Sequence, residues 1–233
     1  MAPFARGFDY RVAKALIKGE NPPRKRTGDG PGPSLKEPRM PSDPDTALVD
    51  GRECGSCTAC CIDLNIDQPD LVKLSDQPCI HCSAGGCGIY ARRPSVCRGF
   101  HCGWRLIPWL GEEWRPDRIG IVVRALDPAE ACPDDPDVPI ALSFDLRRPD
   151  RQLIAMSLAV ACGTLIEAGI PTFLTVPGPP GHAAGRVHLN VLMAPIVASR
   201  DGNAIVTALG LAFDAGLSHT KERVSFQHGT GGP

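Results

Sequence analysis

The residues CGSCTACC at positions 54–61 and PCIHCSAGGCGIYARRPSVCRGFHCGW at positions 78–104 decide the character of this chain. They hold nine of its 11 cysteines, namely Cys54, Cys57, Cys60, Cys61, Cys79, Cys82, Cys87, Cys97 and Cys102. A Cys-x2-Cys step lets two sulfurs converge on one metal ion at about 2.3 Å. The step occurs three times, at 54/57, 57/60 and 79/82. Because sulfur-rich donor sets select zinc, Cu(I) or iron–sulfur clusters over hard cations, the pattern predicts a metal centre built from these nine cysteines.

The same stretch has too few aliphatic residues to fold by burial alone. Leu, Ile and Val occupy only nine of the 49 positions from 54 to 102. A bound metal would supply the missing stability, since structural zinc sites contribute on the order of 10 kcal/mol or more.

The spacing leaves the identity of the metal open. Cys54-x2-Cys57-x2-Cys60 begins like a bacterial ferredoxin run, but Leu64 stands where the fourth cysteine belongs. The nine cysteines suffice for two four-ligand sites or for one cluster with spare thiols. His81 and His101 stand beside cysteines, and we expect polar surface positions or hydrogen bonds to ligands for them rather than metal ligation.

The string CGSCTACC followed by GCGIYARRPSVCRGFHC resembles the zinc- or iron-chelating CxxCxxCC family, the YkgJ-type cysteine cluster proteins. The resemblance covers about 50 of the 233 residues, from Cys54 to Trp104. It implies a metal-chelating module with the ligands Cys54, Cys57, Cys60, Cys61, Cys79, Cys87, Cys97 and Cys102, to which the 79/82 step adds Cys82. Flagellin lysine methylases look similar in the cluster region, which keeps methyl transfer open, although nothing after Trp114 extends that likeness.

Composition divides the chain into four parts and predicts an α+β fold. Residues 1–45 hold eight Pro and five Gly, which is typical of a disordered tail. Residues 46–115 form the expected small, metal-stapled cysteine-rich module, residues 116–220 a mixed α/β half, and residues 221–233 a flexible C-terminus.

Runs of branched residues predict the elements of the C-terminal half. We expect strands at 119–126, 140–146, 171–176 and 187–192, a helix at 151–168, and a last helix that Asp201 or Asn203 caps and that runs through 217. In the cysteine-rich part we expect short helical turns at 57–61, capped by Ser56, and at 89–93, ending before Pro94. Cys162 falls inside the apolar helix and should be a small buried hydrophobe.

Charge and hydropathy limit the partners. With 25 Lys+Arg against 26 Asp+Glu, the formal charge of −1 argues against nucleic acid. The longest mostly apolar run, Leu153 to Ile166, falls short of the roughly 20 residues that a bilayer needs, and Met1 to Arg11 has no apolar signal segment. We therefore expect a cytoplasmic protein, in whose reducing surroundings clustered thiols bind metal more often than they form disulfides.

Three functions fit these observations. The first is a cytosolic zinc- or iron-binding protein whose cluster is structural or stores or senses metal. The second is an iron–sulfur or iron-dependent enzyme or electron carrier, with a substrate between the two halves. The third is thiol–disulfide exchange at Cys79-Ile-His-Cys82, although no strand–helix pattern precedes it. The metal ion is the expected partner, and the sequence identifies no protein partner.

Overall fold

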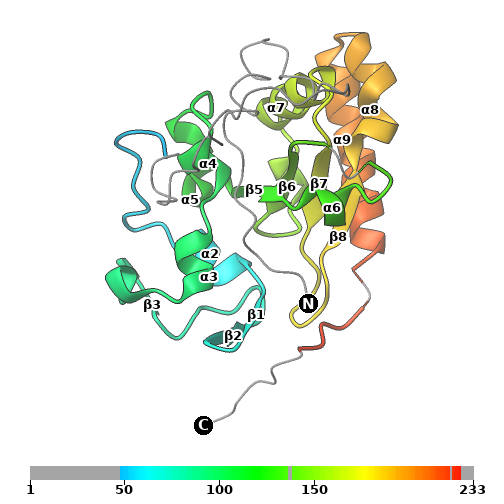
Figure 1. The fold of residues 1–233 in the computed structure, drawn as a ribbon. Helices are drawn as coiled ribbons and strands as arrows, with labels where there is room; N and C mark the ends of the chain where they lie inside the picture. Colours follow the sequence, from blue (N-terminus) through cyan, green and yellow to red (C-terminus); the bar gives the residue numbers. More distant parts are fainter. Residues whose placement is uncertain (1–47, 136–137, 221, 227–233) are drawn as a thin grey trace, which may run out of the picture.

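The computed structural model describes residues 48–135, 138–220 and 222–226 (Figure 1). They form two parts. We call residues 48–102 the cysteine region and residues 103–220 the sheet region. Helices and sheets occur in both, so the expected α+β class is confirmed. The predicted tail at 1–45 lies outside the described residues, as do most of the predicted C-terminal segment at 221–233.

The sheet region is built on a four-stranded mixed sheet of order β5-β6-β7-β8. The β5–β6 and β7–β8 pairs are antiparallel, whereas β6 and β7 are parallel and are joined by a crossover through a helix. The elements in chain order are α4 (Gly103–Leu106), α5 (Pro116–Ile119), β5 (Ile121–Leu126), α6 (Pro128–Ala131), β6 (Ala141–Leu146), α7 (Met156–Glu167), β7 (Thr172–Val176), β8 (Gly185–His188), α8 (Leu189–Ala198) and α9 (Gly202–Ser218), with 3₁₀ turns at Glu112–Trp114 and Arg151–Leu153.

One face of this sheet and the helices enclose the core. Side chains alternate along each strand, so Val123, Phe144 and Leu174 lie on one face and are buried there with residues of α7, α8 and α9. Trp114 packs edge-on against Phe144, with ring centroids 5.9 Å apart. The core therefore includes residues before the first strand of the sheet.

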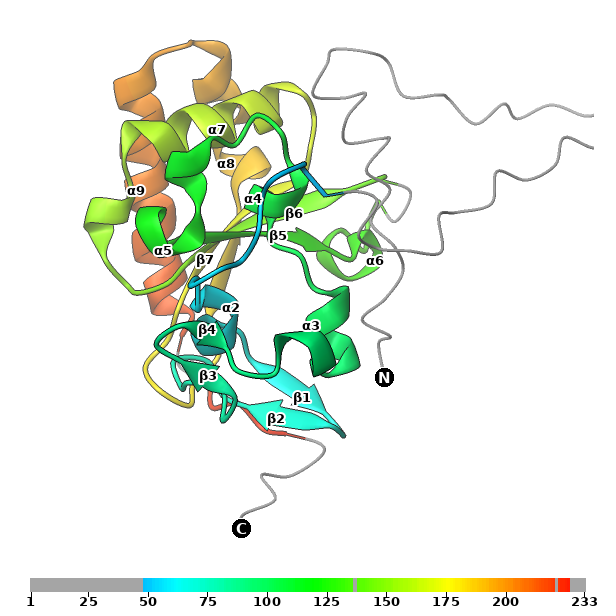
Figure 2. The same cartoon turned by 90° about the vertical axis from the view of Figure 1, so that its left-hand side faces the viewer.

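The cysteine region consists of short elements around its thiols. They are α2 (Ala59–Asp63), the hairpin β1 (Ile66–Gln68) with β2 (Leu71–Lys73), the hairpin β3 (Cys82–Ser83) with β4 (Gly86–Cys87), a 3₁₀ turn at Tyr90–Arg92, and α3 (Ser95–Gly99). In both views the β1–β2 hairpin lies at the end of the molecule far from α7 and α8 (Figure 2).

Polar contacts and one close approach join the two regions. Arg147, just after β6, pairs with Asp63 at the end of α2, and the Val49 N–H donates to the Arg105 carbonyl at 2.8 Å. A Cβ on Gly103 would stand 2.6 Å from the Val123 side chain, so glycine is needed where α4 meets β5. The cysteine region is thus attached along the β5–β6 side of the sheet.

The strand predicted at 187–192 is wrong in its second half, because β8 ends at His188 and α8 begins at Leu189. The Asn190 side chain explains the change. Its oxygen accepts the Thr172 N–H at 2.7 Å and its amide donates to the Ile170 carbonyl at 2.9 Å, which fixes the first turn of α8 against the start of β7.

Two other predicted elements differ at their beginnings. The helix expected from 151 begins at Met156, after a 3₁₀ turn in which the Asp150 carboxylate accepts the Gln152 N–H. The turn expected to be capped by Ser56 begins only at Ala59. Ser56 does not cap it, because its hydroxyl accepts a hydrogen bond from Arg115 at 3.2 Å.

The remaining predicted elements are confirmed, with ends shifted by one or two residues. Asp201 caps α9 by accepting the N–H groups of Asn203 and Ala204, and the turn before Pro94 is a 3₁₀ turn. Cys162 is completely buried, as expected.

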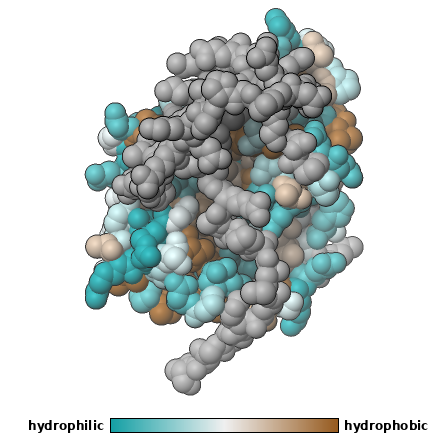
Figure 3. All heavy atoms as spheres, viewed as in Figure 1, coloured by the Kyte–Doolittle hydropathy of each residue, from teal (hydrophilic) through white to brown (hydrophobic). Residues whose placement is uncertain are grey.

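Among the described residues, no helix is long and apolar enough to cross a bilayer. The outer side of α8 nonetheless exposes Val191 and Leu192, and apolar surface is visible along the edge of the molecule where this helix lies (Figure 3).

Candidate metal centre

Short backbone turns and pairings bring cysteines from separate segments near one another. The Cys57 N–H donates to the Cys54 carbonyl at 2.9 Å, so this Cys-x2-Cys step is a tight turn. The Cys82 N–H donates to the Cys79 carbonyl at 2.8 Å in a second turn of the same kind, and Cys82 lies opposite Cys87 in the β3–β4 hairpin. The Cys79 N–H donates to the Cys61 carbonyl, which ties that hairpin to α2.

Electrostatic contacts divide the thiols into two groups. The first thiol group is Cys54, Cys57 and Cys102. The pKa of Cys102 is raised to about 11, mainly by burial and in part by negative charge on Cys54 and Cys57, whereas the Arg105 and Trp104 N–H groups oppose the rise. Burial also raises the pKa of Cys57. The three sulfurs of this group therefore lie close enough to interact through their charges.

The second thiol group is Cys60, Cys61, Cys79, Cys82, Cys87 and Cys97. The pKa of Cys97 is raised to about 11, mainly by burial and in part by negative charge on Cys79, Cys61 and Cys87. The pKa of Cys61 is raised mainly by its hydrogen bond to Cys60, and a hydrogen bond with Cys82 opposes the rise.

The two groups are held side by side through glycines. A Cβ on Gly86, in the second segment, would lie 2.5 Å from the Gly55 carbonyl oxygen, in the first. Gly86 also has φ +112°, a conformation that other residues adopt only with strain. This approach sets the position of the β3–β4 hairpin against the Cys54–Cys57 turn.

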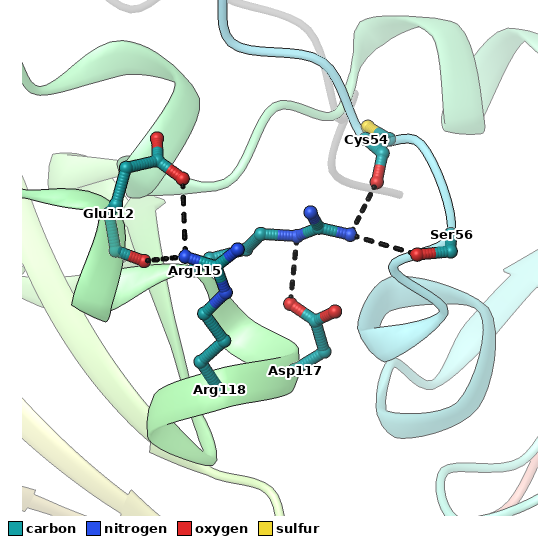
Figure 4. A network of polar contacts seen from close by, with 6 residues as sticks. All are labelled: Cys54, Ser56, Glu112, Arg115, Asp117 and Arg118. Atoms are coloured by element: carbon teal, nitrogen blue, oxygen red, sulfur yellow. Dashed lines mark hydrogen bonds and ion pairs between the residues drawn. The ribbon is translucent and has the colours of Figure 1, made fainter.

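Arg115, from the start of α5, holds the first turn from the side of the sheet region. Its guanidinium donates to the Cys54 carbonyl at 3.3 Å and to the Ser56 hydroxyl at 3.2 Å, and it pairs with Asp117 at 2.9 Å. Figure 4 shows that the Cys54 carbonyl faces Arg115 while its sulfur is turned away. The backbone of the turn is thus anchored and the thiol stays available.

Two buried cations near the thiols, Arg105 and Lys73, were not identified from the sequence. Arg105 contacts the Cys54 sulfur at 3.9 Å, the Tyr90 hydroxyl at 3.5 Å and the Nδ1 of His101 at 3.5 Å. Lys73, in β2, donates to the carbonyls of Ile62, Leu64 and Leu74. Neither stands in a motif, and an isolated Lys or Arg in a sequence is ordinarily a surface residue.

The other polar residues of the cysteine region have structural contacts. Arg93 lies over the Tyr90 ring at 3.8 Å and donates to the Tyr90 carbonyl, and Arg98 donates to the Arg93 carbonyl. The backbone N–H of His81 donates to the Cys79 sulfur at 3.5 Å. These contacts brace the thiols, and in them His81 acts through its backbone.

All 11 cysteines are free thiols. Within the described ranges, no three Cys, His, Asp or Glu side chains already stand in an arrangement that would hold a metal ion. The donors nonetheless fit a soft metal by their chemistry, since thiolates are the preferred ligands of zinc and of iron–sulfur centres. Metal binding at either group therefore requires its sulfurs to draw closer together.

No protein-family model matches this chain, and neither the curated proteins nor the solved structures include a match. The function must therefore be argued from the thiols and their surroundings.

Proposed function

We propose that the protein chelates zinc or iron, as ions or as an iron–sulfur centre, through its nine clustered cysteines. The observation that carries the proposal is the gathering of nine free thiols from separate segments in a region without a core of its own. Only three hydrophobic side chains between 48 and 102 are buried, those of Ala59, Ile66 and Leu71. Metal–thiolate bonds would supply the cross-links that apolar packing does not.

An iron–sulfur or iron-dependent enzyme or electron carrier is the second candidate. It is favoured by the position of Cys54, whose sulfur lies 4.0 Å from the hydroxyl of Tyr90, a side chain that is 43 % exposed. A metal at this sulfur would be close to the surface, where a substrate or an electron-transfer partner can approach. Iron–sulfur centres supply one-electron chemistry, with potentials set by solvent exposure and by hydrogen bonds to sulfur.

We also propose a cytoplasmic location. Nine half-buried thiols without a disulfide fit a reducing compartment, where thiols stay available to metal.

The test is anaerobic purification of the full chain, followed by elemental analysis for zinc and iron, acid-labile sulfide determination and a visible spectrum. Zinc in a colourless sample supports the chelating protein, whereas iron with sulfide supports the second candidate. A preparation that contains neither metal and binds neither Zn²⁺ nor Fe²⁺ after full reduction contradicts both.

Single substitutions test the ligands. Cys57→Ser and Cys97→Ser should each lower the metal content. The matched control is Cys132→Ser, because Cys132 lies in the sheet region and its pKa is raised by burial and Asp135 rather than by other thiols. Unchanged metal content in both cluster variants overturns the ligand assignment.

A further inference from the structure

The described part of the chain contains two buried charged side chains, Lys73 and Arg105, each 7 % exposed. A buried charge is costly unless an opposite charge or several hydrogen bonds compensate it. Arg105 contacts the Cys54 sulfur of the first thiol group at 3.9 Å, and Lys73 donates to the carbonyl of Ile62, the residue after Cys61 of the second thiol group. This distribution needs an explanation that the metal proposal alone does not provide.

Arg105 belongs to the first thiol group. Its guanidinium contacts the Cys54 sulfur, the Tyr90 hydroxyl, a His101 ring nitrogen and the Arg52 carbonyl. Among the described ion pairs, none joins Arg105 to a carboxylate. Arg105 therefore meets the first thiol group at the Cys54 sulfur, 3.9 Å away.

Lys73 belongs to the second thiol group. Burial lowers its pKa, and the largest opposing contribution comes from Cys79, followed by Asp63 and Cys61. Asp63 is already paired with Arg147. The ammonium is held in place by the carbonyls of Ile62 in α2, of Leu64 just after α2, and of Leu74 just after β2, so the backbone sets its position.

We propose that the nine cysteines form two separate metal centres: one at Cys54, Cys57 and Cys102, whose charge Arg105 offsets, and one within the second thiol group, whose charge Lys73 offsets. The inference rests on the proposed metal binding and deepens it. Three thiolates on a divalent ion leave one net negative charge, which one guanidinium cancels. The first centre also leaves one position of a tetrahedral ion to a further ligand, as in zinc sites that are not closed by protein.

Cadmium NMR of the reduced full chain tests the division, because each thiolate-bound Cd²⁺ ion gives its own resonance. We expect at least two resonances. Cys102→Ser should shift or remove one of them and leave the others, and Cys97→Ser should do the reverse. If both variants change the same resonances, there is one shared centre and the division is overturned. If no Cd²⁺ binds at all, the failure is that of metal binding itself.

The cations provide a second measurement that does not remove a ligand. Arg105→Gln should weaken Cd²⁺ binding at the first centre by about tenfold to 100-fold, the range found for residues that support metal ligands. Lys73→Met should do so at the second centre alone. Arg105→Lys, which keeps the charge, should recover most of the affinity. An equal loss at both centres in either variant, or no recovery by lysine, overturns the assignment of one cation to each centre.

Discussion

The cysteine region and the sheet region are stabilised in different ways. The core of the molecule begins at Trp104 and runs through α9, and from the cysteine region only Leu48 and Cys102 pack against it. The sheet region buries large side chains such as Phe144 and Leu174 completely. The cysteine region instead buries Lys73, packs against the buried Arg105 of α4, and half-buries nine thiols. The comparison indicates that burial holds one region, while the other needs a ligand to reach its final geometry.

Removal of metal should have the largest effect and should separate the two regions. Because structural zinc contributes on the order of 10 kcal/mol, a chelator should abolish hydrogen-exchange protection in the cysteine region, for example at the Cys79 N–H, which donates to Cys61. Protection at β6 and β7 should persist. If chelation leaves hydrogen-exchange protection unchanged in both regions, the cysteine region does not need metal for its structure.

The converse perturbation is a cavity in the core of the sheet region. Phe144→Ala should destabilise this region by about 3–5 kcal/mol, the usual cost of truncating a buried aromatic, because Phe144 is fully buried against Trp114. The metal content of the folded protein should not change. Leu211→Ala is the control, since Leu211 is 66 % exposed and surface changes stay within about 0.5 kcal/mol. Chemical unfolding measures both variants.

The boundary between the two thiol groups can be perturbed at one atom. Gly86→Ala places a Cβ against the Gly55 carbonyl and requires alanine to adopt a backbone φ of +112°. The expected cost is about 1–3 kcal/mol. It should lower metal affinity and leave the sheet region intact. Gly99→Ala is the matched control, because a Cβ there meets nothing within 4 Å and the residue ends α3. Equal metal affinities for the two variants would contradict a structural role for the close approach.

Sequence reasoning worked where one local signal decided an element. Branched runs identified β5, β6 and β7, and Asp201 marked the start of α9. It failed at residues 189–192, because the apolar alternation there continues past His188 while contacts of Asn190 with β7 start a helix. A long-range contact of this kind leaves no periodic pattern in the sequence.

The sequence likewise predicted some residues of the candidate site and not others. The nine cysteines could be named from their spacing, since the spacing itself carries the chemistry. The assignment of each thiol to a group, and the cations Arg105 and Lys73, could not be predicted. They depend on which segments the Gly55–Gly86 approach and the Cys61–Cys79 hydrogen bond bring together. The domain boundary predicted at 115/116 stays a prediction, although Trp104 and Trp114 pack in the core of the sheet region.

The smallest expected effect is the contribution of His188, in the sheet region, to the pH dependence of stability. His188 stacks on Phe173 with ring centroids 4.5 Å apart, and its Nε2 is buried without a hydrogen-bond partner in the described structure. Burial lowers its pKa below the usual 6.5, and Asn190 opposes this only in part. Burial in the sheet region therefore disfavours the charged form of this imidazole.

The sign of the pH dependence follows from this lowered pKa. Below pH 6.5 the unfolded chain takes up a proton on His188 before the folded chain does, so the free energy of unfolding falls as the solution is acidified through this range. His188→Gln should make that fall less steep between pH 8 and pH 5. Urea unfolding of both proteins in chelator measures it, because metal binding then adds no pH dependence of its own. Identical slopes, or an imidazole NMR titration at or above about 6.5, would mean that the sheet region does not exclude charge at this position.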